Sequence, residues 1–499
     1  MLYTSTRGAK GLVPSACAIK TGLAGDGGLY VPLAFQPLNE TELRGLCRQG
    51  YVERALTVMG RLLTDYSTDE LREYFSHAYT HDKFGGEPAP LHLINGALGV
   101  LELWHGPTSA FKDMALQVLP YLLTAAAKKT GEQRKIVILV ATSGDTGKAA
   151  LEGFKDVPGT EIVVFYPSEG VSEIQKLQMM TTAGKNVKVF GLKGNFDDAQ
   201  RGVKEIFADK DFRAELDKAG FVLSSANSIN WGRLAPQIVY YFSAYADAVN
   251  KRAVRFGDEI NFVVPTGNFG DILAGYYAKL MGLPVHRLIC ASNSNNVLTD
   301  FLDKGVYDKR REFFKTMSPS MDILVSSNLE RLLYIATQND AVEVAGYMQQ
   351  LQKEGIYHIH SAVHGEIRKD FYGAWASEEQ TKDALQLMFM VNNYISDPHT
   401  AVAISALKQY QADYPRDGRF TIVLSTASPY KFAKDVLCSL GKKTEGVSAW
   451  ELLQQLQQIT GTEVPAGLAG LQNLPVLHDE VIEYADMREK IKKFLEREQ

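Results

Sequence analysis

The chain has 499 residues, which is too long for one hydrophobic core, and roughly 150 residues per domain predicts two to four domains. Its net charge is −5, and no basic run stands out, which argues against a nucleic-acid-binding protein. The apolar runs are of strand length, far below the ~20 residues that span a bilayer, and the four cysteines lie far apart without a CxxC, so we expect a cytoplasmic protein with neither a zinc site nor disulfides.

The first 90 residues form an N-terminal region of strands followed by helices. Residues 1–35 are predicted to form short strands and turns, because Gly25-Asp26-Gly27-Gly28 is a strong turn signal. Residues 39–84 carry a helical apolar pattern, and Ser67-Thr68-Asp69-Glu70 predicts a capping box at a helix start. The cluster Gly85-Gly86-Glu87-Pro88 indicates the end of this region.

After residue 90 the chain repeats an order of apolar strand, small polar loop and helix. Continuous β-branched runs are typical of strands buried on both faces of a parallel sheet, and such sheets bind ligands at the carboxyl ends of their strands. The clearest predicted strands are 135–140, 161–166, 187–190, 261–264, 286–290 and 420–424.

The predicted fold is α/β, with parallel-rich sheets flanked by helices and a helical C-terminus that ends in a charged helix at 480–498. We expect four parts: the N-terminal region, a smaller α/β part, a larger α/β part, and a C-terminal helical segment packed on the core. Their approximate bounds are 1–90, 91–258, 259–443 and 444–499.

One stretch stands out, His105-Gly106-Pro107-Thr108-Ser109-Ala110-Phe111-Lys112-Asp113-Met114-Ala115. Lys112 falls where a loop gives way to an apolar helix, and the helix dipole at that position disfavours a cation. A lysine amine with a lowered pKa is a nucleophile and a base, and such amines commonly form a Schiff base with a carbonyl cofactor. The alternative is a surface lysine in the first turn of a helix.

Three loops have the composition of anion sites. Gly267-Asn268-Phe269-Gly270 joins a predicted strand to a helix, but it is not a G-x-G-x-x-G, so a dinucleotide is not expected. Residues 142–148 superficially resemble a P-loop but lack its glycine and hydroxyl spacing, although their hydroxyls and amides suit a carboxylate or phosphate. Residues 224–233 are rich in hydroxyls and amides and end in Arg233. Each loop is also consistent with a plain turn or a capped helix start.

Two histidine groups have spacings that suit a metal. His77 and His81 lie four apart on a predicted helix, and His358, His360 and His364 form an H-x-H-x-x-x-H. No acidic or third histidine partner lies near the first pair, and nothing supplies catalytic context for the second group, so no metal site is predicted.

In combination, four motifs resemble threonine synthases, in particular the longer bacterial and fungal branch. They are HGPTSAFKDMALQ at 105–117, TSGDTG at 142–147, PTGNFGD at 265–271 and Gly27-Gly28-Leu29-Tyr30-Val31-Pro32. The resemblance runs from Tyr3 to about Phe432 and implies pyridoxal 5'-phosphate on the tryptophan-synthase-β fold (fold type II). The implied reaction is the last step of threonine biosynthesis, in which O-phospho-L-homoserine and water give L-threonine and phosphate by γ-elimination and β-addition of water.

The resemblance also assigns roles to residues. Lys112 corresponds to the Schiff-base lysine and is the expected catalytic residue, and Thr426 falls where the family places a hydroxyl against the pyridine nitrogen. The residues that correspond to the family's cofactor-phosphate site are Gly267, Asn268, Phe269, Gly270 and Asp271. We hypothesise that the substrate's carboxylate and phosphate are bound by Thr142, Ser143, Asp145, Thr146, Asn195, Asn227, Ser228 and Arg233. Asp145 is unfavourable beside an anion, so backbone amides or an arginine are its alternative partners.

Other functions share some of these features. A fold type II dehydratase or phospholyase would also carry Lys112 and the glycine loop, and a non-catalytic binding protein would use the same sheet with an inactive site. Lys112 argues against the last of these. The expected partner is a small-molecule substrate, in a monomer or small homo-oligomer that binds neither nucleic acid nor membrane.

Overall fold

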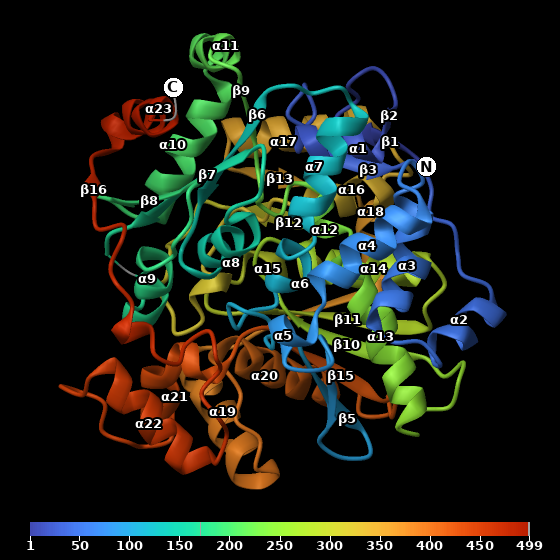
Figure 1. Ribbon diagram of the computed structural model, residues 1–499. Coiled ribbons are helices and arrows are strands. Elements are labelled where there is room, and N and C mark those ends of the chain that lie inside the picture. The colour runs from blue at the N-terminus through green and yellow to red at the C-terminus, as the bar shows by residue number, and fades with distance from the viewer. Residues whose placement is uncertain (170, 498–499) are drawn as a thin grey trace.

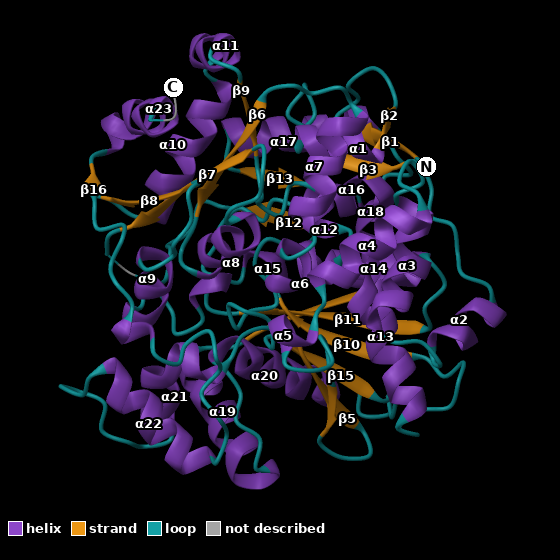
Figure 2. Ribbon diagram, in the orientation of Figure 1, coloured by secondary structure: helices purple, strands orange, loops and turns teal. Residues whose placement is uncertain are grey.

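Two mostly parallel sheets form the centre of the computed structural model, which describes residues 1–169 and 171–497. One sheet lies in the upper left of Figure 1 and the other in the lower right, and Figure 2 shows helices packed around both. This arrangement confirms the predicted α/β class with parallel sheets. The six strands predicted from buried apolar runs are all present.

The larger sheet has six strands in the order β14-β11-β10-β15-β5-β4, and every neighbouring pair is parallel except β4 with β5. Its side chains alternate between two cores, since Phe262 and Val264 of β10 enter one hydrophobic cluster and Val263 enters another. Burial on both faces explains why the central strand β10 is apolar at all its positions but Asn261. The strands are β4 Leu91–Leu93, β5 Leu98–Glu102, β10 Ile260–Pro265, β11 Val285–Ser292, β14 Phe371–Trp375 and β15 Thr421–Ser425.

The smaller sheet has five parallel strands in the order β16-β8-β7-β6-β9. All eight residues of β7 are buried. The strands are β6 Lys135–Ala141, β7 Thr160–Pro167, β8 Val187–Leu192, β9 Phe221–Ser224 and β16 Val481–Ile482.

Helices connect and cover the strands of both sheets. Helix α13 (Gln237–Asn250) is buried nearly all round, because it packs against α14 (Gly270–Leu280) on one side and against α3 (Tyr51–Leu62) of the N-terminal region on another. The helices between the sheet strands are α6 Asp113–Leu116, α7 Leu119–Lys129, α8 Asp145–Phe154, α9 Glu173–Met180, α10 Phe196–Ala208, α11 Lys210–Lys218, α12 Trp231–Leu234, α13 Gln237–Asn250, α14 Gly270–Leu280, α15 Val297–Lys304, α16 Leu329–Ala336, α17 Ala341–Lys353, α18 Ser361–Asp370, α19 Glu378–Asn392 and α20 Pro398–Asp413. Two short strands, β12 Val306–Asp308 and β13 Ile356–His358, form an antiparallel pair beside α15.

The N-terminal region is a small antiparallel sheet followed by helices, as predicted, except that Ser15–Thr21, within the stretch expected to form strands and turns, is a helix. The capping box at Ser67 is present, with the Ser67 side chain accepting from the Glu70 N–H. Tyr3, Leu62 and Phe75 share one hydrophobic cluster with Met114, so this region is part of the common core. Its elements are β1 Leu2–Ser5, β2 Val13–Pro14, α1 Ser15–Thr21, β3 Tyr30–Pro32, α2 Glu40–Leu46, α3 Tyr51–Leu62, α4 Thr68–Ala78 and α5 His81–Phe84.

The C-terminal segment connects the two sheets. Helices α21 Ala433–Ser439 and α22 Ala449–Thr460 pack in the cluster beside the larger sheet. The chain then crosses to the smaller sheet, where β16 pairs with β8 and helix α23 Met487–Glu496 packs in its outer cluster (Figure 1). The terminal helix therefore begins at Met487 and not at 480, because Val481 and Ile482 extend the sheet edge. The last two residues of the expected 444–499 segment lie outside the described residues.

Sheet membership also differs from the expected division at residue 91. Strands β4 and β5, in 91–102, belong to the larger sheet, where β5 pairs with β15 and β4 pairs with β5, although both precede the strands of the smaller sheet. The lysine at 112 therefore lies on the connection from the larger sheet to the smaller sheet.

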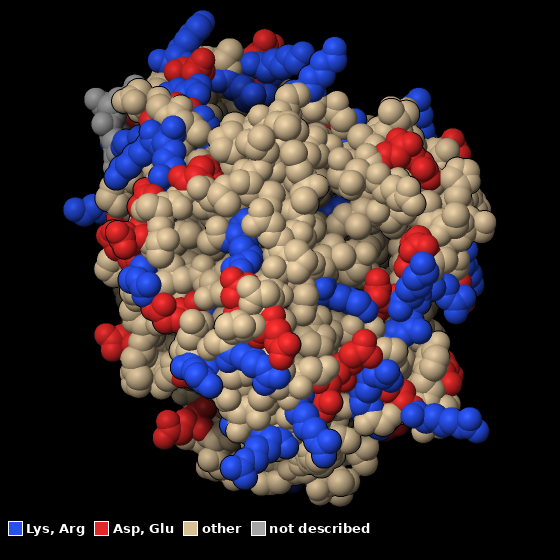
Figure 3. Space-filling model, turned by 90° about the vertical axis from the view of Figure 1, so that its right-hand side faces the viewer, with Lys and Arg blue, Asp and Glu red and all other residues tan. Residues whose placement is uncertain are grey.

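Charged side chains of both signs are interspersed on the face shown in Figure 3, with a broad area between them that carries neither. This mixed distribution agrees with the small net charge. None of the helices in 1–169 and 171–497 is long and apolar enough to cross a membrane.

We predict that Ile491→Ala lowers the free energy of unfolding by about 2–5 kcal/mol, because Ile491 is fully buried where α23 covers the smaller sheet. Urea titration followed by circular dichroism measures the loss. Lys493→Ala, at an exposed position of the same helix, is the matched control and should change little. Equal stability of the two variants would show that α23 is not part of the core.

Candidate active site

The polar loops that follow the strands of both sheets meet around one cavity of about 210 Å³. Loops after β6 and β9 come from the smaller sheet, and loops after β5, β10 and β15 come from the larger one. The carboxyl ends of parallel strands are where ligands bind in such sheets. The predicted site residues that line it are Lys112, Thr142, Ser143, Asp145, Thr146, Asn227, Ser228, Arg233, Gly267, Asn268, Phe269, Gly270, Asp271 and Thr426.

Lys112 occupies the N-cap position of the short helix α6, as its sequence position predicted. Backbone hydrogen bonds attach its loop to the segment after β15: the Phe111 N–H donates to the Thr426 carbonyl at 2.8 Å, and the Ser428 N–H donates to the Ser109 carbonyl at 3.1 Å. Thr426 and Lys112 are therefore fixed side by side, although they lie more than 300 positions apart in the chain.

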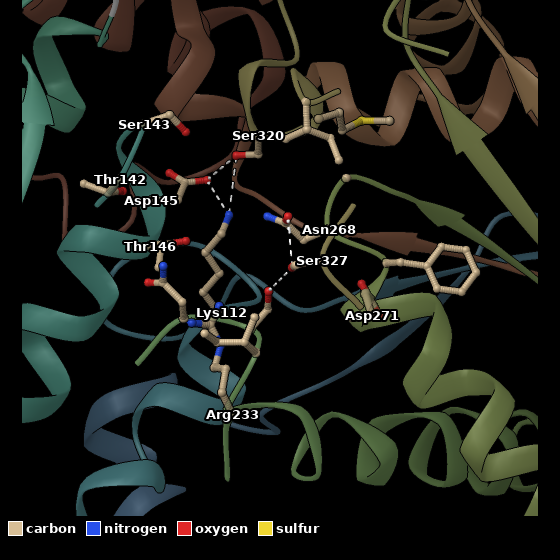
Figure 4. A pocket seen from close by; sticks show the side chains of 18 of the residues that line it. Lys112, Thr142, Ser143, Asp145, Thr146, Arg233, Asn268, Asp271, Ser320 and Ser327 are labelled. Carbon is tan, nitrogen blue, oxygen red and sulfur yellow. Dashed lines mark hydrogen bonds and ion pairs between the residues drawn. The ribbon is translucent and has the colours of Figure 1, made fainter. Parts of the chain in front are cut away.

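The side chain of Lys112 extends into the cavity and ends beside Asp145 and Ser320 (Figure 4). Its Nζ donates to Asp145 Oδ2 at 3.3 Å and to Ser320 Oγ at 3.4 Å. The Ser320 hydroxyl in turn donates to Asp145 Oδ2 at 3.2 Å. The Lys112 amine, the Asp145 carboxylate and the Ser320 hydroxyl are therefore each hydrogen-bonded to the other two.

Asp145 also pairs with a second buried lysine. Lys431 Nζ lies 2.5 Å from Asp145 Oδ1 and donates to the Thr108 carbonyl at 3.0 Å, and its side chain is 0% exposed. Gln175 Nε2 donates to Asp145 Oδ1 at 2.8 Å. The described partners of Asp145 are therefore two lysines and a glutamine, and not the backbone amides or arginine named as its alternative partners, while its contact with a substrate anion stays a prediction.

Burial lowers the pKa of Lys112, and the nearby charges of Lys431 and Arg233 lower that pKa further, against the attraction of Asp145. For Asp145, burial acts to raise the pKa, but the charges of Lys431 and Lys112 outweigh it and hold the pKa well below its ordinary range. The predicted lowering of the Lys112 pKa therefore holds, although the cause is mainly desolvation. The helix dipole of the four-residue α6 is a minor contribution.

The glycine loop forms an uncapped helix start on the opposite side of the cavity. Phe269 is the N-cap of α14 with a left-handed φ of 62°, and no side chain caps this helix. A Cβ at Gly267 would lie 2.7 Å from the Ser320 carbonyl oxygen, so only glycine fits there. The Ser326 hydroxyl supports the loop by donating to the Gly267 carbonyl at 2.8 Å. The N–H groups of the first helical turn are thus available to an anion.

Asp271, in the first turn of α14, has one satisfied and one unsatisfied carboxylate oxygen. Its Oδ1 accepts from Tyr240 at 2.6 Å and from Tyr241 at 2.9 Å, whereas its buried Oδ2 has no partner among the described residues. Burial raises the pKa of Asp271 to about 6, against the hydrogen bonds from the two tyrosines.

Arg233 lies below Lys112 in Figure 4 and forms no ion pair with any described residue. Its Nη1 donates to the Ala226 carbonyl at 2.9 Å, while its buried Nε has no partner in the described part of the chain. Burial lowers the pKa of Arg233 to about 10. Asn227 Oδ1 is likewise buried without a described partner. An unpaired guanidinium on a cavity wall is suited to bind an anion.

The remaining predicted residues divide between the cavity and the scaffold. The Thr142 hydroxyl accepts from the Gly144 and Gly147 N–H groups, so it shapes the loop. Asn195 does not line the cavity, and its expected role in substrate binding is corrected: it is exposed and forms the capping box of α10 with Asp198.

Of the histidines in the two groups, His77 and His364 contact neighbouring elements, whereas His81, His358 and His360 are exposed. His77 stacks on Tyr121, and His364 Nε2 lies 2.9 Å from the Leu302 carbonyl. In residues 1–169 and 171–497, no group of three or more His, Cys, Asp or Glu side chains is arranged to hold a metal.

Among the residues without a predicted role, Ser320 and His399 line the cavity, and Lys431 pairs with Asp145 beside it. Lys431 follows Thr426 within the same loop, so its closeness was a usable signal. Ser320 and His399 come from segments that do not follow a predicted strand, so the sequence carried no signal for either residue.

The residues present fit pyridoxal phosphate. The buried amine suits the aldehyde, and the uncapped start of α14 suits the phosphate. The unpartnered Asp271 Oδ2, Asn227 Oδ1 and Arg233 Nε show that the cavity walls carry polar atoms that the protein itself does not satisfy. Residues 88–426 match the family model "Pyridoxal-phosphate dependent enzyme". Fold and site together define this class of enzyme.

Further comparisons identify the family to which the chain is similar within this class of enzyme. Residues 2–79 match "Threonine synthase N terminus", and residues 400–494 match "Threonine synthase, C-terminal". The chain is 39% identical to "Threonine synthase" of Pseudomonas aeruginosa over 443 residues, covering 87% of this chain and 90% of that protein. A solved structure, PLP-bound threonine synthase from Brucella melitensis, aligns with a TM-score of 0.87 at 34% identity and covers 99% of this chain and 98% of that one.

The chain belongs to the threonine synthase family. It is also 38% identical to "Threonine synthase-like 1" of Homo sapiens over 485 residues, which cover 95% of this chain and 63% of that protein. The chain therefore spans somewhat less than two thirds of the length of that relative.

We predict that Gly267→Ala weakens binding of pyridoxal phosphate at least about tenfold, because the added methyl group pushes against the Ser320 carbonyl and displaces the loop. Titration of the cofactor-free protein, followed by absorbance, measures the change. Gly346→Ala is the control, since its added methyl group meets nothing within 4 Å. Unchanged affinity in Gly267→Ala would exclude the loop as the phosphate site.

We also predict a pH-dependent gain in stability for Asp271→Asn in the cofactor-free protein. The folded-state pKa of about 6 lies above the ordinary 3.8, so the folded protein binds this proton more tightly than the unfolded chain does. Ionisation of Asp271 thus destabilises the fold above about pH 6, and that cost disappears as the pH falls below about 4. The variant should gain up to about 3 kcal/mol at pH 7.5 and nothing at pH 4, as measured by urea titration.

For comparison, Asp211→Asn, at an exposed position of α11, should change the free energy of unfolding by less than about 0.5 kcal/mol at either pH. Loss of stability in Asp271→Asn at pH 7.5 would contradict the raised pKa.

Proposed function

We propose that this protein converts O-phospho-L-homoserine and water into L-threonine and phosphate. The observation that carries the proposal is one cavity that holds a buried lysine amine, an uncapped helix start and an unpaired arginine. Membership of the threonine synthase family supports the choice of reaction.

The cofactor would be held at three points. The backbone of Gly267, Asn268, Phe269 and Gly270 would bind its phosphate, Asp271 would border that phosphate, and the Thr426 hydroxyl would face its ring nitrogen. When bound, pyridoxal phosphate supplies an electron sink for the charge that remains when a proton leaves the substrate's α-carbon.

Lys112 would act as the base. A neutral amine accepts a proton at Nζ, and burial favours that neutral form. Once protonated, the ammonium group is stabilised by Asp145 Oδ2 at 3.3 Å, and it can return the proton to the substrate later in the reaction. Lys431 keeps the Asp145 carboxylate ionised throughout.

The substrate brings two more anionic groups, its carboxylate and its phosphate. Arg233 provides the cationic partner that no described carboxylate occupies, and Asn227 and Ser228 lie on the same loop. Ser143, Thr146 and the Thr142 loop lie across the cavity at the start of α8, where helix N–H groups favour an anion. These two walls would separate the two anions.

A cytoplasmic location fits the four cysteines, which are all free. The small-molecule substrate is the proposed partner, in a monomer or small homo-oligomer.

The test is incubation of the holoenzyme with O-phospho-L-homoserine. We expect phosphate and threonine in equal amounts, measured by a phosphate assay and amino-acid analysis. Lys112→Ala should lose both the turnover and the visible absorbance band of the bound cofactor, because the amine that anchors the cofactor is gone.

The competing activities give other products. A dehydratase or phospholyase would release ammonia and a keto acid, and a binding protein would release nothing. Full activity and an unchanged absorbance band in Lys112→Ala would contradict the assignment of the base.

A further inference from the structure

Ser320 connects the two halves of the site. It lies in a 3₁₀ turn, Pro319–Met321, within the long connection between β12 and α16. Its hydroxyl contacts Lys112 Nζ and Asp145 Oδ2, and its carbonyl oxygen packs beneath Gly267. One residue thus contacts both the reacting amine and the loop that is expected to hold the cofactor phosphate.

A buried histidine holds this turn. The Ser320 backbone N–H donates to His399 Nε2 at 3.1 Å, and His399 Nδ1 lies 2.7 Å from Asp397 Oδ1. A backbone N–H can only donate, so Nε2 must be the unprotonated nitrogen, and Nδ1 carries the proton that is donated to Asp397. This arrangement fixes one neutral tautomer of His399 and one orientation of its ring.

Asp397 is itself fully satisfied and buried. As the N-cap of α20, it accepts from the His399 N–H at 2.8 Å and from the Thr400 N–H at 3.4 Å, as well as from the Thr400 hydroxyl. His399 and Asp397 are 2% and 0% exposed, so water does not compete for these bonds. The start of α20, a helix packed on the larger sheet, therefore fixes the ring against the turn.

We propose that Ser320 is a catalytic residue and that His399 and Asp397 position it. This inference rests on the proposed function, since it assumes that Lys112 reacts. A neutral amine has two N–H groups and one lone pair in a tetrahedral arrangement. When Asp145 Oδ2 and Ser320 Oγ accept the two N–H groups, the lone pair is directed away from both, toward the cavity that Lys112 lines.

The hydroxyl is oriented for this task. Because Ser320 donates its own proton to Asp145 Oδ2, the lone pairs of its oxygen are left to accept from Lys112. Without the hydroxyl, one N–H of the amine loses its acceptor, so the amine can rotate and its lone pair is no longer held in one direction. This loss should slow the chemical step more than it weakens substrate binding.

The first test is the pair Ser320→Ala and Ser320→Thr in the holoenzyme. We expect Ser320→Ala to lower kcat about tenfold or more with KM within about threefold of wild type, and Ser320→Thr to recover most of that loss because it restores a hydroxyl. Wild-type kcat in Ser320→Ala would overturn the proposal, as would equal losses in both variants.

The second test separates the two nitrogens of His399. The amide of His399→Gln reaches the place of Nε2 and can accept from the Ser320 N–H, whereas the amide of His399→Asn reaches only the place of Nδ1 and faces Asp397. We expect His399→Asn to lower kcat as Ser320→Ala does and His399→Gln to retain more activity. The reverse order, or equal activity in both, would contradict the positioning role.

A spectral titration makes the test independent of the substrate. The absorbance of bound pyridoxal phosphate reports protonation at the Lys112 nitrogen, and the other charged groups around that nitrogen, Asp145, Lys431, Arg233 and Asp271, are the same in every variant. We expect Ser320→Ala and His399→Asn to shift the pH midpoint by about half a unit or more, and Ser320→Thr and His399→Gln to shift it less.

The two proposals can fail separately. If wild-type protein releases no threonine but the midpoints shift as expected, the reaction is wrong and the Ser320 assignment stands. If threonine forms and no midpoint or kcat changes, the reaction stands and the Ser320 assignment is wrong. Thermal unfolding of each variant confirms that it is folded before either comparison is made.

Discussion

The site depends on one carboxylate, Asp145, held between two buried lysines. Lys431 at 2.5 Å and Lys112 at 3.3 Å come from different segments, one after β15 of the larger sheet and one on the connection to the smaller sheet. Asp145 itself begins α8, after β6 of the smaller sheet. Buried charges persist in a protein only when they are paired, so this arrangement fixes both sheets against each other at the point where the cavity forms.

The two lysines have different surroundings, and this difference assigns their roles. Lys431 is enclosed, bonded to Asp145 and to the Thr108 carbonyl, and its side chain has no exposed surface. Lys112 is slightly exposed on the cavity side and faces the glycine loop across the cavity. Lys431 therefore serves as a fixed charge that holds Asp145 ionised, and the amine of Lys112 is the one that a ligand can reach.

Much of this arrangement was visible in the sequence, because local signals coincide with the site. The apolar runs gave the strands, and the glycine and hydroxyl loops that follow them line the cavity at 142–146 and 267–271 as expected. The sequence did not reveal how far-apart segments meet. Ser320 and His399 lie outside any strand-to-loop pattern, and only the folded chain brings His399 Nε2 to the Ser320 N–H.

Two of the misplaced predictions, those for Asn195 and for the start of the terminal helix, have the same origin. Asn195 has the composition of a ligand residue but caps α10, because a side-chain amide at a helix start satisfies the backbone first. Val481 and Ile482 were expected within a terminal helix, yet they pair with the edge of β8, since an open strand edge offers backbone partners that a short charged helix lacks. Both outcomes are decided by backbone hydrogen bonding that composition does not show.

The claim that the Lys112 amine reacts with the cofactor can be measured directly. Borohydride reduction of the holoenzyme fixes the cofactor to the amine that holds it, and mass spectrometry of proteolytic peptides then locates the modified lysine. The geometry predicts the label on the peptide that contains Lys112 and none on Lys431. A label on Lys431, or an unlabelled Lys112, would contradict the account.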